Sequence, residues 1–232
     1  KSLLMKDSPI HERAFYLQNT GGVHYDVVLN VSHFTFAKGQ SLQNPISVST
    51  PFQLHPCNLE DQVFLCSLLK VPLVVKHNSK ELSKPLGKPT KLYRMQGDGN
   101  CLFRSLSFLV TGRETYHSDV RQKVVEHMMM IETYLLPQIS FSILEEYFAH
   151  TRMKNQSAWG TDVEILAASS LLERDIYVCT KVGTTYKWQR FSKSLLMKDL
   201  PIHERAFYLQ NTGGVHYDVV LNVNFQNDFT LK

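Results

Sequence analysis

The stretch Gly97-Asp98-Gly99-Asn100-Cys101-Leu102-Phe103-Arg104-Ser105 decides how the rest of the chain is arranged. Glycines at 97 and 99 reach backbone angles that strain other residues, so the pattern predicts a sharp turn just before Cys101. From Cys101 onward the apolar residues follow helical spacing, which predicts a helix that begins at the cysteine. A thiol there lies beside unpaired N–H groups and the positive end of the helix dipole, and both favour the thiolate. The same N–H groups could hold an oxyanion, so the stretch indicates a nucleophilic cysteine.

Three sets of residues, in order along the chain, resemble the motifs of OTU (ovarian tumour) cysteine proteases, which are deubiquitinases. They are Asp98-Gly99-Asn100-Cys101 with the following Leu-Phe-Arg-Ser, then Trp159-Gly160 and Arg174-Asp175-Ile176-Tyr177, and finally His216-Tyr217-Asp218. The resemblance spans residues 91–223, and ordered motifs are far more specific than a single one. It implies a papain-like OTU fold, and it favours a catalytic Cys101 over a buried structural cysteine.

The histidine motif has the spacing of a catalytic pair. Residues two apart on a strand share a face, so His216 and Asp218 point the same way. Asp218 can then bond one ring nitrogen of His216 and leave the other directed at Cys101, which is the arrangement of nucleophile, base and orienting acid. A half-exposed strand histidine is the competing interpretation for His216 alone. Gly213 and Gly214, just upstream, leave room for a substrate to approach closely.

The resemblance also assigns roles around the cysteine turn. It makes the backbone of Asp98, Gly99, Asn100 and Cys101 the oxyanion hole, and in some relatives Asp98 is counted among the catalytic residues. Aspartate is common in turns because it bonds its own backbone, so we expect Asp98 to stabilise the turn and Asp218 to orient His216. The sequence leaves both as candidates for the third catalytic residue. By resemblance, the loop of Trp159 and Gly160 lies near the channel for the C-terminal tail of ubiquitin.

Length and composition set the outer limits. The 232 residues suffice for one domain, or one domain with an appendage. No apolar run approaches the roughly 20 residues that span a membrane, and the net charge of +4 is dispersed, so neither a membrane nor a nucleic-acid partner is expected. The cysteines at 57, 66, 101 and 179 lack paired metal-ligand spacing. This spacing predicts no metal site, and a candidate thiolate among the four favours a reducing, cytoplasmic compartment. Catalysis by a thiol needs no metal and no organic cofactor, so we expect neither.

Residues 1–31 recur almost unchanged as residues 193–223, with only Ser8 replaced by Leu200. Such a copy predicts a longer parent protein with tandem units, of which this chain, beginning without Met, would be a fragment. Residues 1–31 would be the tail of a preceding unit. They contain His24 and Asp26 but no upstream cysteine turn, so we expect no catalysis from them. Exchange of this segment with another chain is a further expectation.

The remaining boundaries follow from composition and periodicity. Residues 32–90 are predicted as a linker or N-terminal extension with a short helix capped by Asn58 and a short strand at 73–75. The catalytic domain is predicted over 91–223, and 224–232 form a C-terminal tail. Within the domain, Ser118 is expected to cap a long helix that ends at Pro137, with the Met128-Met129-Met130 run filling the core.

Loop-to-helix transitions and strands complete the fold class. Capping-box patterns at Ser142 with Glu145 and at Thr161 with Glu164 predict two further helix starts. Strands are predicted over 175–180, 185–191, 206–210 and 215–222. Helices first and hairpins last indicate an α+β fold, with helices packed on a mainly antiparallel sheet.

The resulting hypothesis is a deubiquitinase that acts on ubiquitin or polyubiquitin. It would hydrolyse the isopeptide bond after the Gly-Gly end of ubiquitin through an acyl-thioester on Cys101. One alternative is a self-processing protease that cuts between tandem units. The other is a catalytically silent ubiquitin-binding module, which the presence of Cys101, His216 and Asp218 argues against.

Overall fold

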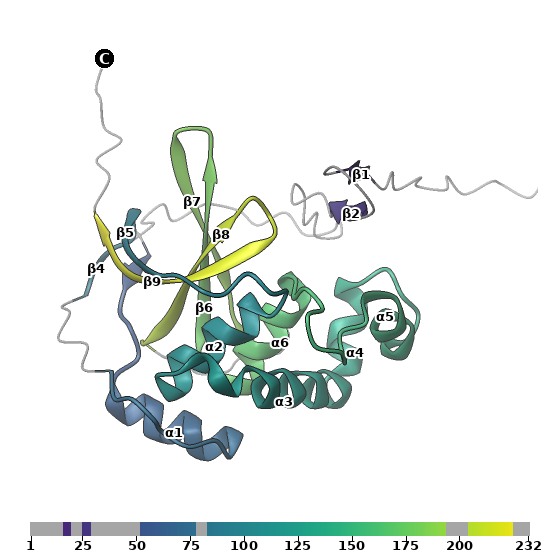
Figure 1. The fold of residues 1–232 in the computed structure, drawn as a ribbon, viewed down its shortest axis with the longest axis horizontal. Helices are drawn as coiled ribbons and strands as arrows, with labels where there is room; N and C mark the ends of the chain where they lie inside the picture. Colours follow the sequence, from purple (N-terminus) through teal and green to yellow (C-terminus); the bar gives the residue numbers. More distant parts are fainter. Residues whose placement is uncertain (1–15, 20–24, 29–51, 78–82, 194–203, 225–232) are drawn as a thin grey trace, which may run out of the picture. The chain divides into compact units, whose positions relative to one another are not determined.

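The computed structural model describes residues 16–19, 25–28, 52–77, 83–193 and 204–224 (Figure 1). Residues Lys1–Val48 and Ser49–Lys232 form two separate compact units. The first unit holds strands β1 (Tyr16–Asn19) and β2 (Tyr25–Val28), which pair antiparallel. The second unit holds every helix and strand described below.

A five-stranded sheet forms the centre of the second unit, in the order β5-β9-β8-β6-β7. Strands β6 and β8 run parallel, and the other neighbouring pairs are antiparallel. A separate two-stranded ribbon pairs β3 with β4. The bounds are β3 Gln53–Leu54, β4 Lys84–Pro85, β5 Lys88–Tyr93, β6 Asp175–Val182, β7 Thr185–Phe191, β8 Ala206–Thr212 and β9 His216–Asn224.

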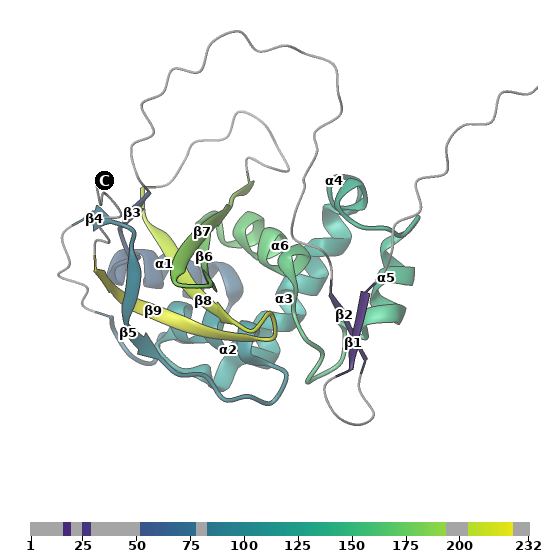
Figure 2. The same cartoon turned by 90° about the horizontal axis from the view of Figure 1, so that it is seen from above.

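The helices occupy the chain between β5 and β6, apart from α1, which precedes β4. Figures 1 and 2 show α2 and α6 close to the sheet, with α3 further from it. The bounds are α1 Leu59–Leu69, α2 Cys101–Thr111, α3 His117–Met130, α4 Glu132–Leu135, α5 Leu144–Thr151 and α6 Asp162–Leu172, with short 3-10 turns η1 Glu114–Tyr116 and η2 Leu136–Gln138. Among the described residues, no helix is both long and apolar enough to cross a membrane.

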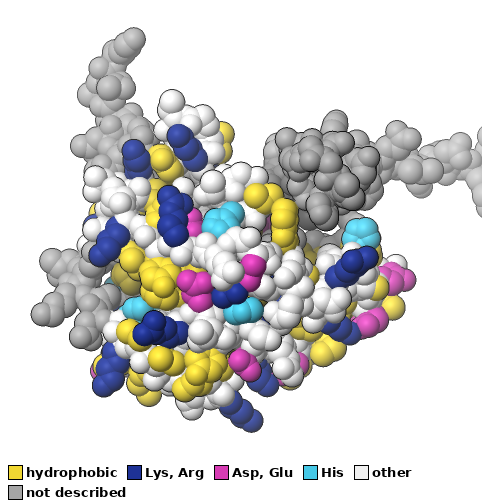
Figure 3. All heavy atoms as spheres, in the orientation of Figure 1, with side chains coloured by type: hydrophobic (Ala, Val, Ile, Leu, Met, Phe, Trp, Pro, Cys, Tyr) yellow, Lys and Arg dark blue, Asp and Glu magenta, His cyan; other side chains and the backbone are white. Residues whose placement is uncertain are grey.

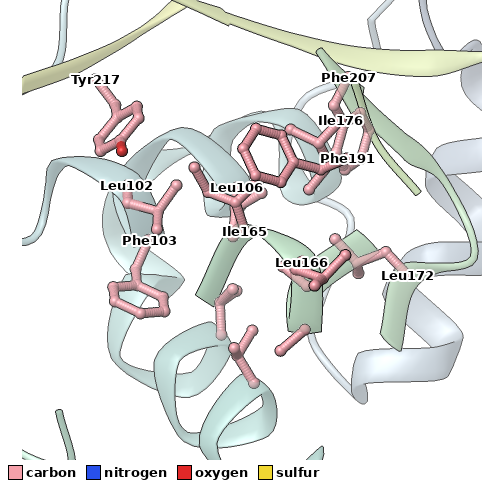
Figure 4. Close-up of a cluster of buried hydrophobic side chains, with 14 of the residues drawn as sticks. Leu102, Phe103, Leu106, Ile165, Leu166, Leu172, Ile176, Phe191, Phe207 and Tyr217 are labelled. Carbon is pink, nitrogen blue, oxygen red and sulfur yellow. The ribbon is translucent and has the colours of Figure 1, made fainter. Parts of the chain in front are cut away.

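Alternation along the strands gives the sheet two apolar faces. On the helical face, Phe207 and Leu209 of β8 join the main core, and Figure 4 shows Phe207 in one cluster with Leu106 of α2 and Ile165 of α6. On the other face, Ala206 and Tyr208 of the same strand join a smaller cluster with residues of β3, β9 and the segment before β5. This alternation is the period-two pattern of a strand that is buried on both sides.

The predicted fold class is confirmed: helices pack on a mixed, mainly antiparallel sheet. The predicted strands form as β6 to β9, and the first two are joined through Gly183 as a hairpin. The capping box of Thr161 with Glu164 starts α6, and Asn58 with Asp61 forms another at the start of α1. Local hydrogen-bonding chemistry was sufficient to locate these starts.

Several local predictions were wrong. Ser118 lies inside the first turn of α3, after the cap residue Tyr116, and Ser142 forms no capping box, because α5 begins at Leu144. The Leu144 N–H bonds instead to the Glu132 carboxylate, 2.8 Å away and twelve residues upstream. A distant carboxylate has replaced the local cap, which a local pattern cannot foresee.

The predicted long helix is also interrupted, because α3 ends at Met130 and the chain continues through α4 and η2. Of the methionine run, Met128 is fully buried, whereas Met129 and Met130 are 49% and 78% exposed. Core filling therefore applies to Met128 alone. The segment 73–75 forms no strand.

Within residues 32–90, predicted as a linker or an N-terminal extension with a short helix, residues 53–77 and 83–90 belong to the same compact unit as the rest of the domain, and α1 is a short helix capped by Asn58. Leu65 and Leu69 of α1 lie in the main core, and β5 begins at Lys88, where it pairs with β9. The strand β5 thus begins three residues before residue 91, where the catalytic domain was predicted to start. The described face in Figure 3 shows basic and acidic side chains interspersed rather than gathered by sign.

Candidate active site

The turn before α2 depends on Gly99. Its φ is +82°, in the left-handed region, and a Cβ at this position would lie 2.3 Å from the backbone oxygen of Ser157. Both the backbone angle and the close approach of the 157 segment therefore require glycine. This contact fixes the turn against the loop that precedes α6.

Replacing Gly99 by alanine is expected to lower the free energy of unfolding by about 1–3 kcal/mol, because a strained φ adds to a backbone clash. Gly183 is the matched control, since its φ is +61° and nothing lies within 4 Å of a Cβ placed there. Chemical denaturation of Gly99→Ala and Gly183→Ala measures the difference. Equal losses in the two variants would show that the clash with Ser157 contributes nothing.

Cys101 is the first residue of α2, and its side chain lies alongside the start of β9. The residue is 6% exposed, and its Sγ donates weakly to the Val215 carbonyl at 3.9 Å. Burial raises the pKa of the Cys101 thiol, whereas backbone N–H groups of Tyr217, Leu102 and Cys101 itself act to lower it. The helix N-terminus thus acts in the predicted direction, but in this structure desolvation is the larger effect.

His216 lies between Asp218 and the cysteine turn. Its Nε2 is 3.1 Å from Asp218 Oδ1, so the predicted pairing of the two side chains on one face of the strand is present. Its Nδ1 and Cε1 face Gly97, and a Cβ placed on that glycine would lie 4.0 Å from both atoms. The ring nitrogen that Asp218 leaves unbonded is therefore directed toward the turn that carries Cys101.

Cys101 is still expected to alkylate faster than the other three cysteines. Burial raises the pKa of both Cys57 and Cys179 to about 12, and it also raises that of Cys66. Cys101 is bonded by backbone N–H groups that stabilise its thiolate, and the His216 imidazole lies close to its turn. Iodoacetamide labelling of folded protein at neutral pH, followed by mass spectrometry, tests this. Equal labelling of all four thiols would contradict it.

Asp98 and Asp218 occupy different environments. Asp98 accepts from the Arg104 guanidinium at 2.5–3.1 Å and from the Asn100 N–H at 3.0 Å. These hydrogen bonds, led by Arg104, hold the pKa of the Asp98 carboxyl well below its usual range. Asp218 is fully buried and bonds His216. The geometry therefore supports the turn role for Asp98, and it commits the Asn100 N–H to that carboxylate rather than to an oxyanion.

A buried arginine that the sequence analysis did not single out ties the turn to the loop before α6. Arg121 of α3 is 1% exposed and donates to Asn100 Oδ1 at 2.9 Å and to the Ala158 carbonyl at 2.7 Å. The Ser157 N–H donates to the same Asn100 oxygen at 2.9 Å. The sequence signal was a charged residue in helical register with Val124, Val125 and Met128, which form the buried face of α3.

The predicted channel residues lie on two loops beside the cysteine. Trp159 is 48% exposed, and Gly160 packs so closely on Leu102 that a Cβ would lie 2.3 Å from its Cδ2. Gly213 and Gly214 both have positive φ, and nothing lies within 4 Å of a Cβ at Gly214. Open space at the second loop is compatible with close approach of an extended peptide.

Among the described residues, no cluster of His, Cys, Asp and Glu could hold a metal ion.

The sequence profile of the family described as OTU-like cysteine protease matches residues 96–217. The chain belongs to this family. The matched segment contains Cys101 and His216 and ends one residue before Asp218. Apart from Asp218, the OTU motifs named from the sequence are therefore parts of one continuous family match, which also includes the helices between them.

Among curated proteins, the ubiquitin thioesterase otu2 of Schizosaccharomyces pombe is 30% identical over 136 residues, which are 53% of this chain and 43% of that protein. The OVARIAN TUMOR DOMAIN-containing deubiquitinating enzyme 11 of Arabidopsis thaliana is 29% identical over 126 residues, 54% of this chain and 47% of that protein. The chain thus spans less than half the length of these two OTU relatives.

Solved OTU domains also match. The OTU domain of OTUD1 is 22% identical with a TM-score of 0.49, covering 56% of this chain and 85% of that one. The Hazara virus OTU bound to ubiquitin is 18% identical with a TM-score of 0.46, covering 66% of this chain and 97% of that one.

Proposed function

We propose that this chain is a deubiquitinating cysteine protease that hydrolyses the isopeptide bond after the C-terminal Gly-Gly of ubiquitin. The observation that carries the proposal is the convergence of Cys101 on α2 with His216 on β9, in a member of a cysteine protease family. The names of the curated relatives, a ubiquitin thioesterase and a deubiquitinating enzyme, support ubiquitin as the substrate.

In the proposed mechanism, His216 takes the proton of the Cys101 thiol while Asp218 holds the imidazole through Nε2. The thiolate attacks the carbonyl carbon of the terminal glycine. The Asn100 N–H is bound by Asp98, so the other backbone N–H groups of the turn stabilise the oxyanion. Protonated His216 then gives its proton to the leaving lysine amine, and water hydrolyses the acyl-thioester to restore the thiol.

The proposed path for the substrate tail runs between the loop of Trp159 and Gly160 and the turn of Gly213 and Gly214. The exposure of Trp159 and the open space beside Gly213 and Gly214 fit a narrow tail that ends in two glycines, and Gly160 allows its loop to pack on Leu102 next to the cysteine. We propose these four residues as the channel, and Asp98, Gly99, Asn100 and Cys101 as the turn that presents the nucleophile.

The experiment is incubation of the purified chain with a panel of ubiquitin chains of different linkages, beside the Cys101→Ala variant. Release of mono-ubiquitin by the parent protein but not by the variant supports the proposal. A ubiquitin-derived electrophile with a reactive C-terminus should also label Cys101. Failure of both cleavage and labelling would instead favour a catalytically silent ubiquitin-binding module.

The near-identical segments 1–31 and 193–223 favour a second candidate, a protease that cuts between tandem units of its own parent protein. A protein with two complete units, incubated without ubiquitin, tests it: cleavage between units that Cys101→Ala prevents would support self-processing. We also infer tandem OTU units in the parent and a reducing, cytoplasmic compartment. The latter rests on four free cysteines, one of them the proposed nucleophile.

A further inference from the structure

Asp218 has a second charged partner, which lies outside its own strand. The Arg94 guanidinium donates to Asp218 Oδ2 at 2.6 Å, whereas His216 bonds Oδ1. The Asp218 side chain is fully buried, and the Arg94 side chain is 70% exposed. A buried carboxylate at the proposed site is therefore bonded on its outer side by an arginine that is otherwise in solvent.

The pairing of β5 with β9 delivers Arg94 to this position. Tyr93 is opposite Val219 in the register, so the next residue along the chain falls beside Asp218. The following N–H, of Met95, donates to Asp218 Oδ1 at 2.9 Å. The Tyr93 ring stacks on Phe108 of α2 with centroids 4.0 Å apart, which fixes the end of the strand. Arg94 is thus anchored by a paired strand on one side and by the Met95 hydrogen bond on the other.

We propose that Arg94 is a positioning residue of this site. It holds Oδ2 of Asp218 so that Oδ1 faces His216, and its charge limits how strongly Asp218 stabilises the protonated imidazole. The inference rests on the proposed function in that it concerns the same three residues. A buried carboxylate shared with a cation attracts a second cation less strongly than it would alone. An imidazolium held less strongly gives up its proton more readily to a leaving amine.

Other charged groups also face the site, and a substitution at Arg94 leaves them in place. On the turn, Asp98 is paired with Arg104, and on α3 the buried Arg121 guanidinium donates to Asn100 of the same turn. From α6, the negative charge of Glu164 favours the protonated forms of Arg121 and Tyr217. Burial also raises the pKa of the Tyr217 phenol, which keeps it neutral. The charge of Asp162 on α6 also raises the pKa of the Tyr217 phenol.

The test follows the proton of His216 directly, by NMR titration of its ring C–H signal in a Cys101→Ala background. In Arg94→Gln, which retains hydrogen-bonding capacity but not charge, the titration curve is expected to move to higher pH, because the positive charge that competes for Asp218 is removed. Arg94→Lys should retain most of the original curve. Lys154→Gln is the matched control, since Lys154 is an exposed, paired cation that contacts Glu145.

A His216 curve that does not move in Arg94→Gln would overturn the proposal, as would an equal shift in Lys154→Gln. An equal shift in Arg94→Lys would overturn the part that assigns the effect to charge. Because the titration uses no ubiquitin, its outcome is independent of whether the chain cleaves ubiquitin. Loss of the proposed function and loss of this inference would therefore be recognised separately.

Discussion

Replacement of Cys101 by alanine or serine is expected to lower ubiquitin-chain hydrolysis by at least about 1,000-fold while leaving the fold nearly unchanged. The nucleophilic sulfur is lost in both variants, and the hydroxyl of serine is a much weaker nucleophile at neutral pH. The side chain is small, and the contact of its Sγ with the Val215 carbonyl is weak. Little packing is therefore lost with the thiol.

Cleavage of a fluorogenic ubiquitin C-terminal substrate and thermal unfolding measure the two halves of this expectation. Cys179→Ala is the matched control, since Cys179 is a fully buried cysteine on β6, away from the turn. It should retain activity even where it costs some stability. Undiminished hydrolysis by folded Cys101→Ala would end the proposed mechanism.

The sequence was sufficient wherever a residue acts through its neighbours in the chain. The glycine turn, the helix that begins at Cys101 and the shared face of His216 and Asp218 all follow from local backbone rules. The capping box at Thr161 belongs to the same class. These features carry most of the candidate site, because its chemistry is concentrated in two short motifs.

Partners that are distant in the chain could not be predicted. Arg94 and Asp218 are separated by 124 residues, and Arg121 and Asn100 by 21, so both pairs depend on tertiary packing. The same limit explains the failure at Ser142, where Glu132 binds the start of α5. The thiol pKa was also misjudged, because the sequence reveals the helix N-terminus but not the burial that opposes it.

His216→Ala is expected to lower turnover by about 1,000-fold or more. The factor by which Asp218→Ala lowers turnover should be roughly 10–100 times smaller. The imidazole itself carries the proton, whereas Asp218 orients and supports it. Single-turnover and steady-state rates on the same substrate give the ranking. A more severe effect of Asp218→Ala, together with loss of turnover in folded Asp98→Ala, would show that the acid has been assigned wrongly.

The duplicated segment makes the His216 experiment sharper, because His24 lies in an identical motif. The two hairpins share their register, with Leu17 opposite Val27 in one and Leu209 opposite Val219 in the other. His24 itself lies outside the described residues.

Connectivity favours the later copy, since it follows β7 directly, although loop-closure entropy contributes only about 1–2 kcal/mol. If residues 1–31 took its place, the later copy would also lose the pairing of β9 with β5 and of β8 with β6. We therefore expect His24→Ala to retain nearly full turnover. Near-normal turnover in His216→Ala, lost on adding His24→Ala, would mean that the upstream copy can take the place of β8 and β9.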